Sequence, residues 1–141
     1  MSDQAQRLAW NTQVIEEFRA NEGVVGGQFQ GSSLLLLTTT GARSGLPRTM
    51  PLAYVPDGDL LVVFAANGGR PTHPGWYHNL CADPRATVEV GTERFQARAT
   101  PAEGAAYERL WAAQVARMPM MEEFRERSGR RIPVMVLERA G

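Results

Sequence analysis

Short stretches of apolar residues, or of alternating apolar and polar residues, recur along this chain as they do in β-strands. Glycine turns such as Asp57-Gly58 and Gly91-Thr92 separate several of them, and connections this short favour antiparallel neighbours. The pattern therefore predicts about six antiparallel strands. They cover residues 33–40, 49–55, 60–66, 86–90, 94–100 and 132–137.

Four further stretches carry the 3.6-residue spacing of amphipathic helices. These cover residues 2–21, 74–82, 101–117 and 120–127, with Pro119 between the last two. In the first helix the apolar stripe consists of Leu8, Trp10, Val14, Ile15 and Phe18. This N-terminal segment, residues 1–22, is expected to pack on the core, to act as a lid or to face a partner. The strands do not alternate with helices, so the pattern favours a mainly β fold with flanking helices: a closed or partly closed antiparallel barrel.

Length and composition narrow the class of protein. The 141 residues are expected to form one domain, residues 1–141. The 15 basic and 15 acidic residues cancel, which argues against nucleic-acid binding. No stretch is apolar enough for an integral membrane segment, although weak peripheral contact stays open. The single Cys81 excludes an intramolecular disulfide, and we expect a cytoplasmic protein.

The sequence Gly41-Ala42-Arg43-Ser44-Gly45, followed by Pro47 and Arg48, ends the first predicted strand; we call residues 41–48 the arginine turn. Glycines let backbone N–H groups approach an anion closely, and guanidinium groups form bidentate hydrogen bonds with phosphate or carboxylate. The turn therefore suits an anionic group. A polar hairpin with solvated arginines is the alternative that these residues leave open.

Residues 65–69, Ala-Ala-Asn-Gly-Gly, end another predicted strand; we call them the glycine segment. Small residues there give a flat backbone surface, and Trp76 at the start of the next helix could wall one side of it. Such a floor suits a planar ring, with backbone amides near ring carbonyl oxygens. A glycine loop beside a core tryptophan is an equally good interpretation of these residues.

Metal and nucleophile chemistry have weaker support. His73, His78 and Cys81 lie within nine residues, but a fourth ligand is missing, so no metal site is expected. Nothing marks an oxyanion hole beside Cys81, which we interpret as a small buried hydrophobe. All 15 basic residues are arginine, so no lysine can serve as a Schiff base.

Several of these runs together resemble the deazaflavin-dependent nitroreductase family. The matching runs are TTTGARSGLPR, Pro51-Leu52, AANGGRPTHPGWYHNL, Asp83-Pro84 and RRIPVMVLE, with Phe18-Arg19 near the N-terminus. The resemblance implies a split β-barrel of the FMN-binding split-barrel-like class. It also implies an oxidoreductase that uses reduced coenzyme F420 to deliver hydride to an electrophilic small molecule.

Carried over by position, the resemblance implies that Arg43, Ser44 and Arg48 hold the phosphate and acidic tail of the coenzyme. The residues implied to border the deazaflavin ring are Pro51, Ala66, Asn67, Gly68, Gly69, Gly75 and Trp76. The substrate pocket would include Met118, Met121 and Phe124, where the well-studied nitro-reducing member of the family has three tyrosines. Methionine and phenylalanine cannot donate a proton to a substrate, so no catalytic residue is assigned.

The expected acceptor is a conjugated C=C bond, a quinone or a nitro compound. Two alternatives stay open: an FMN-dependent split-barrel oxidoreductase, and a non-catalytic protein that binds deazaflavin. Either a monomer or a homodimer is compatible with the sequence.

Overall fold

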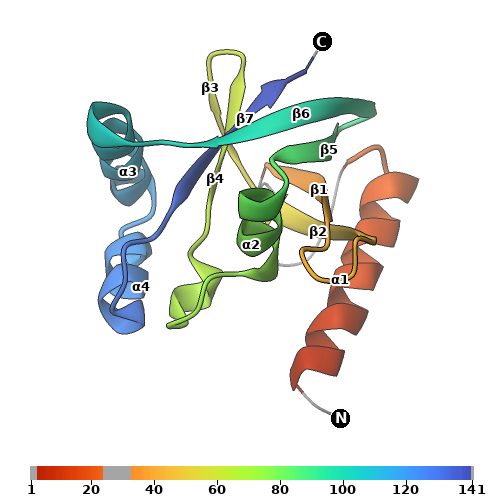
Figure 1. Ribbon diagram of the computed structural model, residues 1–141, viewed down its shortest axis with the longest axis horizontal. Coiled ribbons are helices and arrows are strands. Elements are labelled where there is room, and N and C mark those ends of the chain that lie inside the picture. The colour runs from red at the N-terminus through yellow and green to blue at the C-terminus, as the bar shows by residue number, and fades with distance from the viewer. Residues whose placement is uncertain (1–2, 24–32, 141) are drawn as a thin grey trace.

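A computed structural model of the protein describes residues 3–23 and 33–140, except for the side chains of residues 3–8 and the surroundings of Gly68. Within these residues the chain forms seven strands, four α-helices and one 3-10 helix (Figure 1). In chain order they are α1 (Asp3–Ala20), β1 (Leu34–Thr40), β2 (Pro47–Ala53), β3 (Val55–Asp57), β4 (Leu60–Phe64), η2 (Asn67–Gly69), α2 (Gly75–Ala82), β5 (Arg85–Val90), β6 (Glu93–Pro101), α3 (Gly104–Arg117), α4 (Met120–Ser128) and β7 (Val134–Arg139).

All seven strands belong to one sheet with the order β2-β1-β5-β6-β7-β4-β3. Every neighbouring pair is antiparallel. Figure 1 shows the sheet strongly curled, with α1 on one side, α3 and α4 on the opposite side, and α2 between them. The prediction of a mainly antiparallel fold with flanking helices is confirmed.

Both faces of β1 are covered, which explains its run of four leucines. Leu35 and Leu37 enter the main core together with Trp76 of α2. Leu34 and Leu36 point to the other face, where they pack against α1. Adjacent residues of a strand point to opposite faces, so a continuous apolar run is what a strand buried on both sides requires.

The stripe of α1 supplies that outer layer. Val14 and Phe18 are buried against β1, and Ile15 packs beside them. Trp10 of the predicted stripe is 38% exposed, and the Leu8 side chain lies outside the described residues. Arg19 at the end of the helix donates two hydrogen bonds to the carboxylate of Glu89 on β5. In the described part of the chain, no helix has both the length and the hydropathy needed to cross a membrane.

A second core cluster joins α3 and α4 to the sheet. Tyr107 and Trp111 of α3 are buried with Met121 of α4, and their aromatic rings stack with centroids 6.2 Å apart. The Tyr107 hydroxyl donates a 2.7 Å hydrogen bond to the carbonyl of Ile132. The amphipathic helix expected over residues 101–117 is thus present as α3, with its apolar side against the sheet.

Most boundaries differ from the sequence prediction by one to three residues, and the strand pairing explains two of these shifts and one additional strand. The second strand starts at Pro47 rather than Thr49, because its pairing with β1 continues to the Thr40–Pro47 pair. Pro101 belongs to β6 opposite Met135, so the following helix starts at Gly104 and not at Pro101. A short strand, Val55–Asp57, pairs with β4 and was not predicted as a separate element.

Candidate functional site

The arginine turn is closed by its own hydrogen bonds. The Gly41 N–H donates to the Leu46 carbonyl at 2.8 Å, and the Gly45 N–H donates to the Gly41 carbonyl at 2.9 Å. Gly45 has φ 71°, a conformation that residues with a side chain rarely adopt. The turn therefore has a defined shape although most of its residues are exposed.

The side chain of Ser44 folds back over Gly41. Its hydroxyl oxygen accepts a 3.1 Å hydrogen bond from the Leu46 N–H. A Cβ added at Gly41 would lie only 2.5 Å from this oxygen and 3.2 Å from the Leu46 carbonyl oxygen, so a larger residue there would displace the Ser44 side chain. Because the oxygen acts as acceptor, the hydroxyl hydrogen of Ser44 is left to donate to another group.

Arg43 and Arg48 are exposed, and within the described residues neither forms a salt bridge. Arg85 and Arg109, by contrast, each make two hydrogen bonds to a neighbouring carboxylate. Arg48 opposes Thr39 in the sheet and its aliphatic stem passes close to Gly41. Two guanidinium groups thus flank the turn with their hydrogen-bonding capacity available to an anion.

Asn79 of α2 joins the turn to the end of β1. Its amide oxygen accepts a 2.9 Å hydrogen bond from the Ala42 N–H, and its amide nitrogen donates to the buried Thr39 hydroxyl at 3.0 Å. The sequence interpretation gave Asn79 no role. The available signal was an asparagine inside a short helix, where its propensity is low and a side-chain contact has to compensate.

The glycine segment folds into the 3-10 helix η2 after β4 ends. Asn67 has φ 51° and Gly69 has φ 82°. The Gly69 N–H donates to the Ala66 carbonyl at 3.0 Å, and the Asn67 side chain donates to the Thr72 carbonyl at 2.9 Å. The segment is thus a compact turn rather than an extended strip of backbone.

Arg130, which precedes β7, holds this segment from the side. Its guanidinium donates to the carbonyls of Ala65 and Ala66, both at 3.1 Å, and to the carbonyl of Arg70 at 3.2 Å. A fourth contact joins its Nη1 to the Nδ1 of His73 at 2.9 Å. Burial and the charges of Arg130 and His78 lower the pKa of His73. The sequence interpretation used the RRIP run only for the resemblance and assigned no role to Arg130.

Two of the predicted site regions meet at α4. A Cβ at Gly69 would lie 3.1 Å from Cδ1 of Phe124, so the aromatic ring packs directly on the glycine segment. Met121 is buried in the second core cluster, together with Tyr107 and Trp111, whereas Met118 is 43% exposed at the end of α3. The three residues of the predicted substrate pocket therefore have different surroundings.

The remaining predicted site residues lie outside the cluster that contains Met121 and Phe124. Trp76 is only 4% exposed and packs in the main core, and Gly75 next to it is exposed with open space where a Cβ would lie. Pro51 is paired with Leu36, on the sheet face that α1 covers. Trp76 meets the glycine segment inside the main core, where it packs in the same cluster as Ala65.

Cys81 is exposed, so the interpretation of this residue as a buried hydrophobe is wrong. In α2 the side chains of Trp76 and Leu80 face the core, and Cys81 follows Leu80 on the outer side. The His73 and His78 rings lie 5.7 Å apart, yet the described residues contain no group of His, Cys, Asp and Glu side chains suited to a metal ion.

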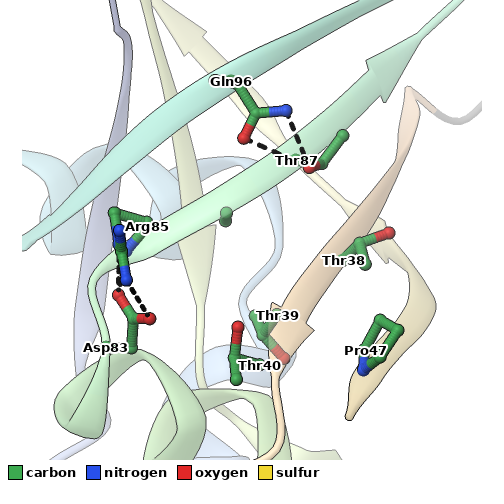
Figure 2. A pocket seen from close by; sticks show the side chains of 9 residues that line it. Thr38, Thr39, Thr40, Pro47, Asp83, Arg85, Thr87 and Gln96 are labelled. Carbon is green, nitrogen blue, oxygen red and sulfur yellow. Dashed lines mark hydrogen bonds and ion pairs between the residues drawn. The ribbon is translucent and has the colours of Figure 1, made fainter. Parts of the chain in front are cut away.

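A polar hollow of about 290 Å³ lies at the base of the arginine turn and contains none of the predicted site residues (Figure 2). Thr40 and Pro47, the pair that opens and closes the turn, form one wall. Opposite them, Arg85 is bonded to Asp83, and Thr87 to Gln96. Because these polar groups satisfy one another, the hollow by itself indicates no ligand. The other lining residues are Thr38, Thr39 and Ala86.

Comparison with known proteins supports one family. The model of the F420H(2)-dependent quinone reductase family matches residues 10–139. An F420H(2)-dependent quinone reductase of Mycobacterium tuberculosis is 40% identical over 126 residues, which cover 86% of this chain and 85% of that protein.

Two of the solved structures that are similar to this chain share more than 30% of its sequence over the matched part. One is an F420-H2 dependent reductase (FDR-A), with a TM-score of 0.67 and 36% identity; the match covers 75% of this chain and 94% of that one. The other is described as a domain-swapped dimer, with a TM-score of 0.70 and 32% identity over 96% of this chain and 100% of that one. The split-barrel class of fold expected from the resemblance is confirmed by these neighbours.

Proposed function

Because this chain belongs to the F420H(2)-dependent quinone reductase family, we propose that its arginine turn and glycine segment are the two ends of one coenzyme F420 site. The protein is an F420H2-dependent reductase, as its relatives are. The proposal assigns the parts of that activity to residues of this chain.

The observation that carries the assignment is the position of α2 between the two regions. Asn79 near the end of α2 bonds to the arginine turn, and His73 just before its start bonds to the Arg130 clamp on the glycine segment. The four residue steps of helix from Gly75 to Asn79 span about 6 Å, and the side chains of His73 and Asn79 make the contacts at either end. A ligand with a planar ring at one end and a phosphate with an acidic tail at the other suits two such regions.

At the anionic end, Arg43 and Arg48 hold the phosphate and the acidic tail, and the Ser44 hydroxyl donates a further hydrogen bond. The fit is supported by the lack of a carboxylate partner for either arginine within the described residues. Since both guanidinium groups are exposed, their attraction for the tail weakens as ionic strength rises.

At the ring end, the glycine segment forms the floor. We assign Ala66, Asn67, Gly68 and Gly69 to the ring border, and we propose that Gly75, which is exposed at the start of α2, also borders the ring. Trp76 supports this border from the core, where it packs in the same cluster as Ala65. We keep Pro51 in the proposed border, although it pairs with Leu36 on the face of the sheet that α1 covers. When bound, the reduced coenzyme supplies a hydride to the acceptor.

The role of the protein is to hold the acceptor against the coenzyme ring in the orientation that hydride transfer needs. We place the acceptor beside α4, where Phe124 covers Gly69 and Met118 is exposed. These side chains are apolar and do not donate protons, so a quinone or a conjugated C=C bond suits the site better than a nitro compound. A proton then comes from solvent.

We also propose that the protein assembles as a homodimer, which the domain-swapped relative supports. Light scattering of the purified protein tests this, and a purely monomeric mass would contradict it. A cytoplasmic location is likewise retained as a proposal, to be tested by cell fractionation.

The test of the coenzyme site is a fluorescence titration with F420 and, in parallel, with FMN. Tight, salt-sensitive binding of F420 and weak binding of FMN is the expected result. Oxidation of the reduced coenzyme by a soluble quinone then separates a reductase from a carrier. Binding of FMN alone would overturn the coenzyme assignment, and binding without turnover would leave a deazaflavin carrier.

A further inference from the structure

We propose that Arg130 is a positioning residue, which fixes the shape of the glycine segment and so sets the place of the deazaflavin ring. This inference rests on the coenzyme site proposed above. Arg130 itself does not need to touch the ring, because it acts through the backbone of the segment.

The guanidinium group is engaged almost completely. Nε donates to the Arg70 carbonyl, Nη1 to His73, and Nη2 to the carbonyls of both Ala65 and Ala66. A planar fork with five N–H groups can grip several carbonyls in a fixed geometry, which an ammonium group cannot reproduce. Four of those five N–H groups bond to residues 65–73, two of them to the glycine segment itself.

The segment needs such a grip because the sheet no longer supports it. Ala65 still pairs with Pro133 through its N–H, but the strand β4 has ended at Phe64. Two positions later Asn67 adopts φ 51°, a conformation that persists in a non-glycine residue only when its surroundings hold it. Arg130 binds the two carbonyls that directly precede this residue.

The contact with His73 defines the state of the imidazole. A guanidinium can only donate, so Nδ1 of His73 must accept and the neutral ring carries its proton on Nε2. The ring also stacks at a tilt against Tyr77, with centroids 4.6 Å apart. Arg130 thereby connects the end of the segment with the start of α2.

The next residue provides a matched control. The guanidinium carbon of Arg131 lies 3.8 Å from the centre of the Tyr107 ring, on the side of α3. Its charge is the same and its position differs by one residue, yet no contact joins it to the glycine segment among the described residues. Because lysine keeps the positive charge at both positions, a pair of lysine variants separates loss of the guanidinium contacts, which only Arg130 makes to this segment, from any effect of charge.

The experiment compares Arg130→Lys with Arg131→Lys. Each variant is titrated with F420 and with a tail-less deazaflavin that lacks the phosphate and glutamates. We expect Arg130→Lys to weaken both ligands by the same factor, about tenfold, because the ring floor is changed. We expect Arg131→Lys to bind both as the unchanged protein does, and Arg43→Ala to weaken F420 only.

Three results would overturn the inference: unchanged binding in Arg130→Lys, an equal loss in Arg131→Lys, or a loss in Arg130→Lys confined to the ligand with a tail. If Arg130→Lys does not fold, His73→Ala removes one of the four contacts and should give a smaller loss for both ligands.

Amide hydrogen exchange separates this inference from the function. Without any coenzyme, residues 65–73 should exchange faster in Arg130→Lys and unchanged in Arg131→Lys. If the unchanged protein binds no F420, the proposed function fails, and the exchange result still decides whether Arg130 fixes the segment. Equal exchange in both variants would reject the positioning role itself.

Discussion

Asn79 accepts a 2.9 Å hydrogen bond from the backbone N–H of Ala42, and this contact ties helix α2 to the arginine turn. The same side chain donates to the Thr39 hydroxyl, so one amide joins α2 to the arginine turn and to β1, through residues 37 and 40 positions earlier in the sequence. The shape of the proposed anion site therefore depends on a residue outside the turn.

Replacement of Asn79 by Ala should lower the free energy of unfolding by about 1–2 kcal/mol, because the buried Thr39 hydroxyl loses its partner. Coenzyme affinity should fall as well. Asn79→Asp is the informative control: its carboxylate accepts from both Ala42 and Thr39 and keeps the turn, but it places negative charge beside Arg43. Chemical denaturation should thus show nearly unchanged stability for Asn79→Asp, whereas F420 titration should show weaker coenzyme binding. Equal stability of the alanine variant and the unchanged protein would show that the amide is dispensable.

The double variant Arg43→Ala, Arg48→Ala should weaken F420 binding by about 2–5 kcal/mol in total, if both hold anionic groups. The salt dependence of the remaining binding should become shallower, since fewer charges contact the ligand. Isothermal titration at two ionic strengths measures both effects. The control removes the same charge from α3 with Arg109→Ala and Arg117→Ala; a comparable loss there would indicate a general field and not a local site.

The pH dependence of stability should report on His73. Its pKa is lowered in the folded protein by burial and by Arg130 and His78, so the unfolded chain binds the proton more readily. Stability from this group is complete above the unfolded pKa near 6.5 and is lost as the pH falls below it. The neighbouring Tyr77 stays protonated, since burial raises its pKa.

Urea denaturation at pH 7.5 and 5.5 measures this loss. In His73→Asn the side-chain oxygen still accepts from Arg130 but does not titrate, so the slope between these pH values should flatten. Asp57 and Asp83 do not interfere, because their lowered pKa values affect stability only in more acidic solution. An unchanged slope in His73→Asn would assign the effect to another group.

Gly69 and Phe124 give a prediction about packing. In Gly69→Ala the alanine would have to adopt φ 82°, and its Cβ would lie 3.1 Å from the Phe124 ring, so backbone strain and crowding act together. Gly58→Ala is matched in conformation, with φ 62°, but has open space around it. We expect a loss of about 1 kcal/mol for Gly58 and a larger one for Gly69. Adding Phe124→Leu should recover part of the difference; equal losses at the two glycines would refute the contact.

The sequence predicted most of the fold because the local signals agreed. Hairpin turns such as Asp57-Gly58 lie between runs of strand-forming residues, and short connections leave antiparallel pairing as the simple solution. The ends of strands were less predictable, since Pro101 remains in β6 through a pairing with Met135 that is remote in sequence. Local propensity favours Pro101 as the start of a helix, but its pairing with Met135 keeps it in the strand β6.

The site was predictable where one segment contains its chemistry. The arginine turn is contiguous, so Arg43, Ser44 and Arg48 could be proposed together. Arg130 could not be found in this way, because it meets Ala65 across 65 residues of chain. For Cys81 the composition suggested burial, but the side of α2 that faces the core is occupied by Trp76 and Leu80.

The two methionines of the substrate pocket implied by the resemblance, Met118 and Met121, should respond differently to replacement by tyrosine. Met118 is 43% exposed, so Met118→Tyr should fold with a stability within about 0.5 kcal/mol of the unchanged protein. Met121 is 2% exposed, so Met121→Tyr must bury a hydroxyl and a larger ring, at a cost of about 1–3 kcal/mol. Thermal denaturation measures this contrast.

If the acceptor binds beside α4, Met118→Tyr adds a proton donor there and should raise the rate with nitro compounds relative to quinones. Tyrosine at the exposed Ala116 of α3 is the control, and an identical acceptor preference in all three proteins would move the acceptor away from α4.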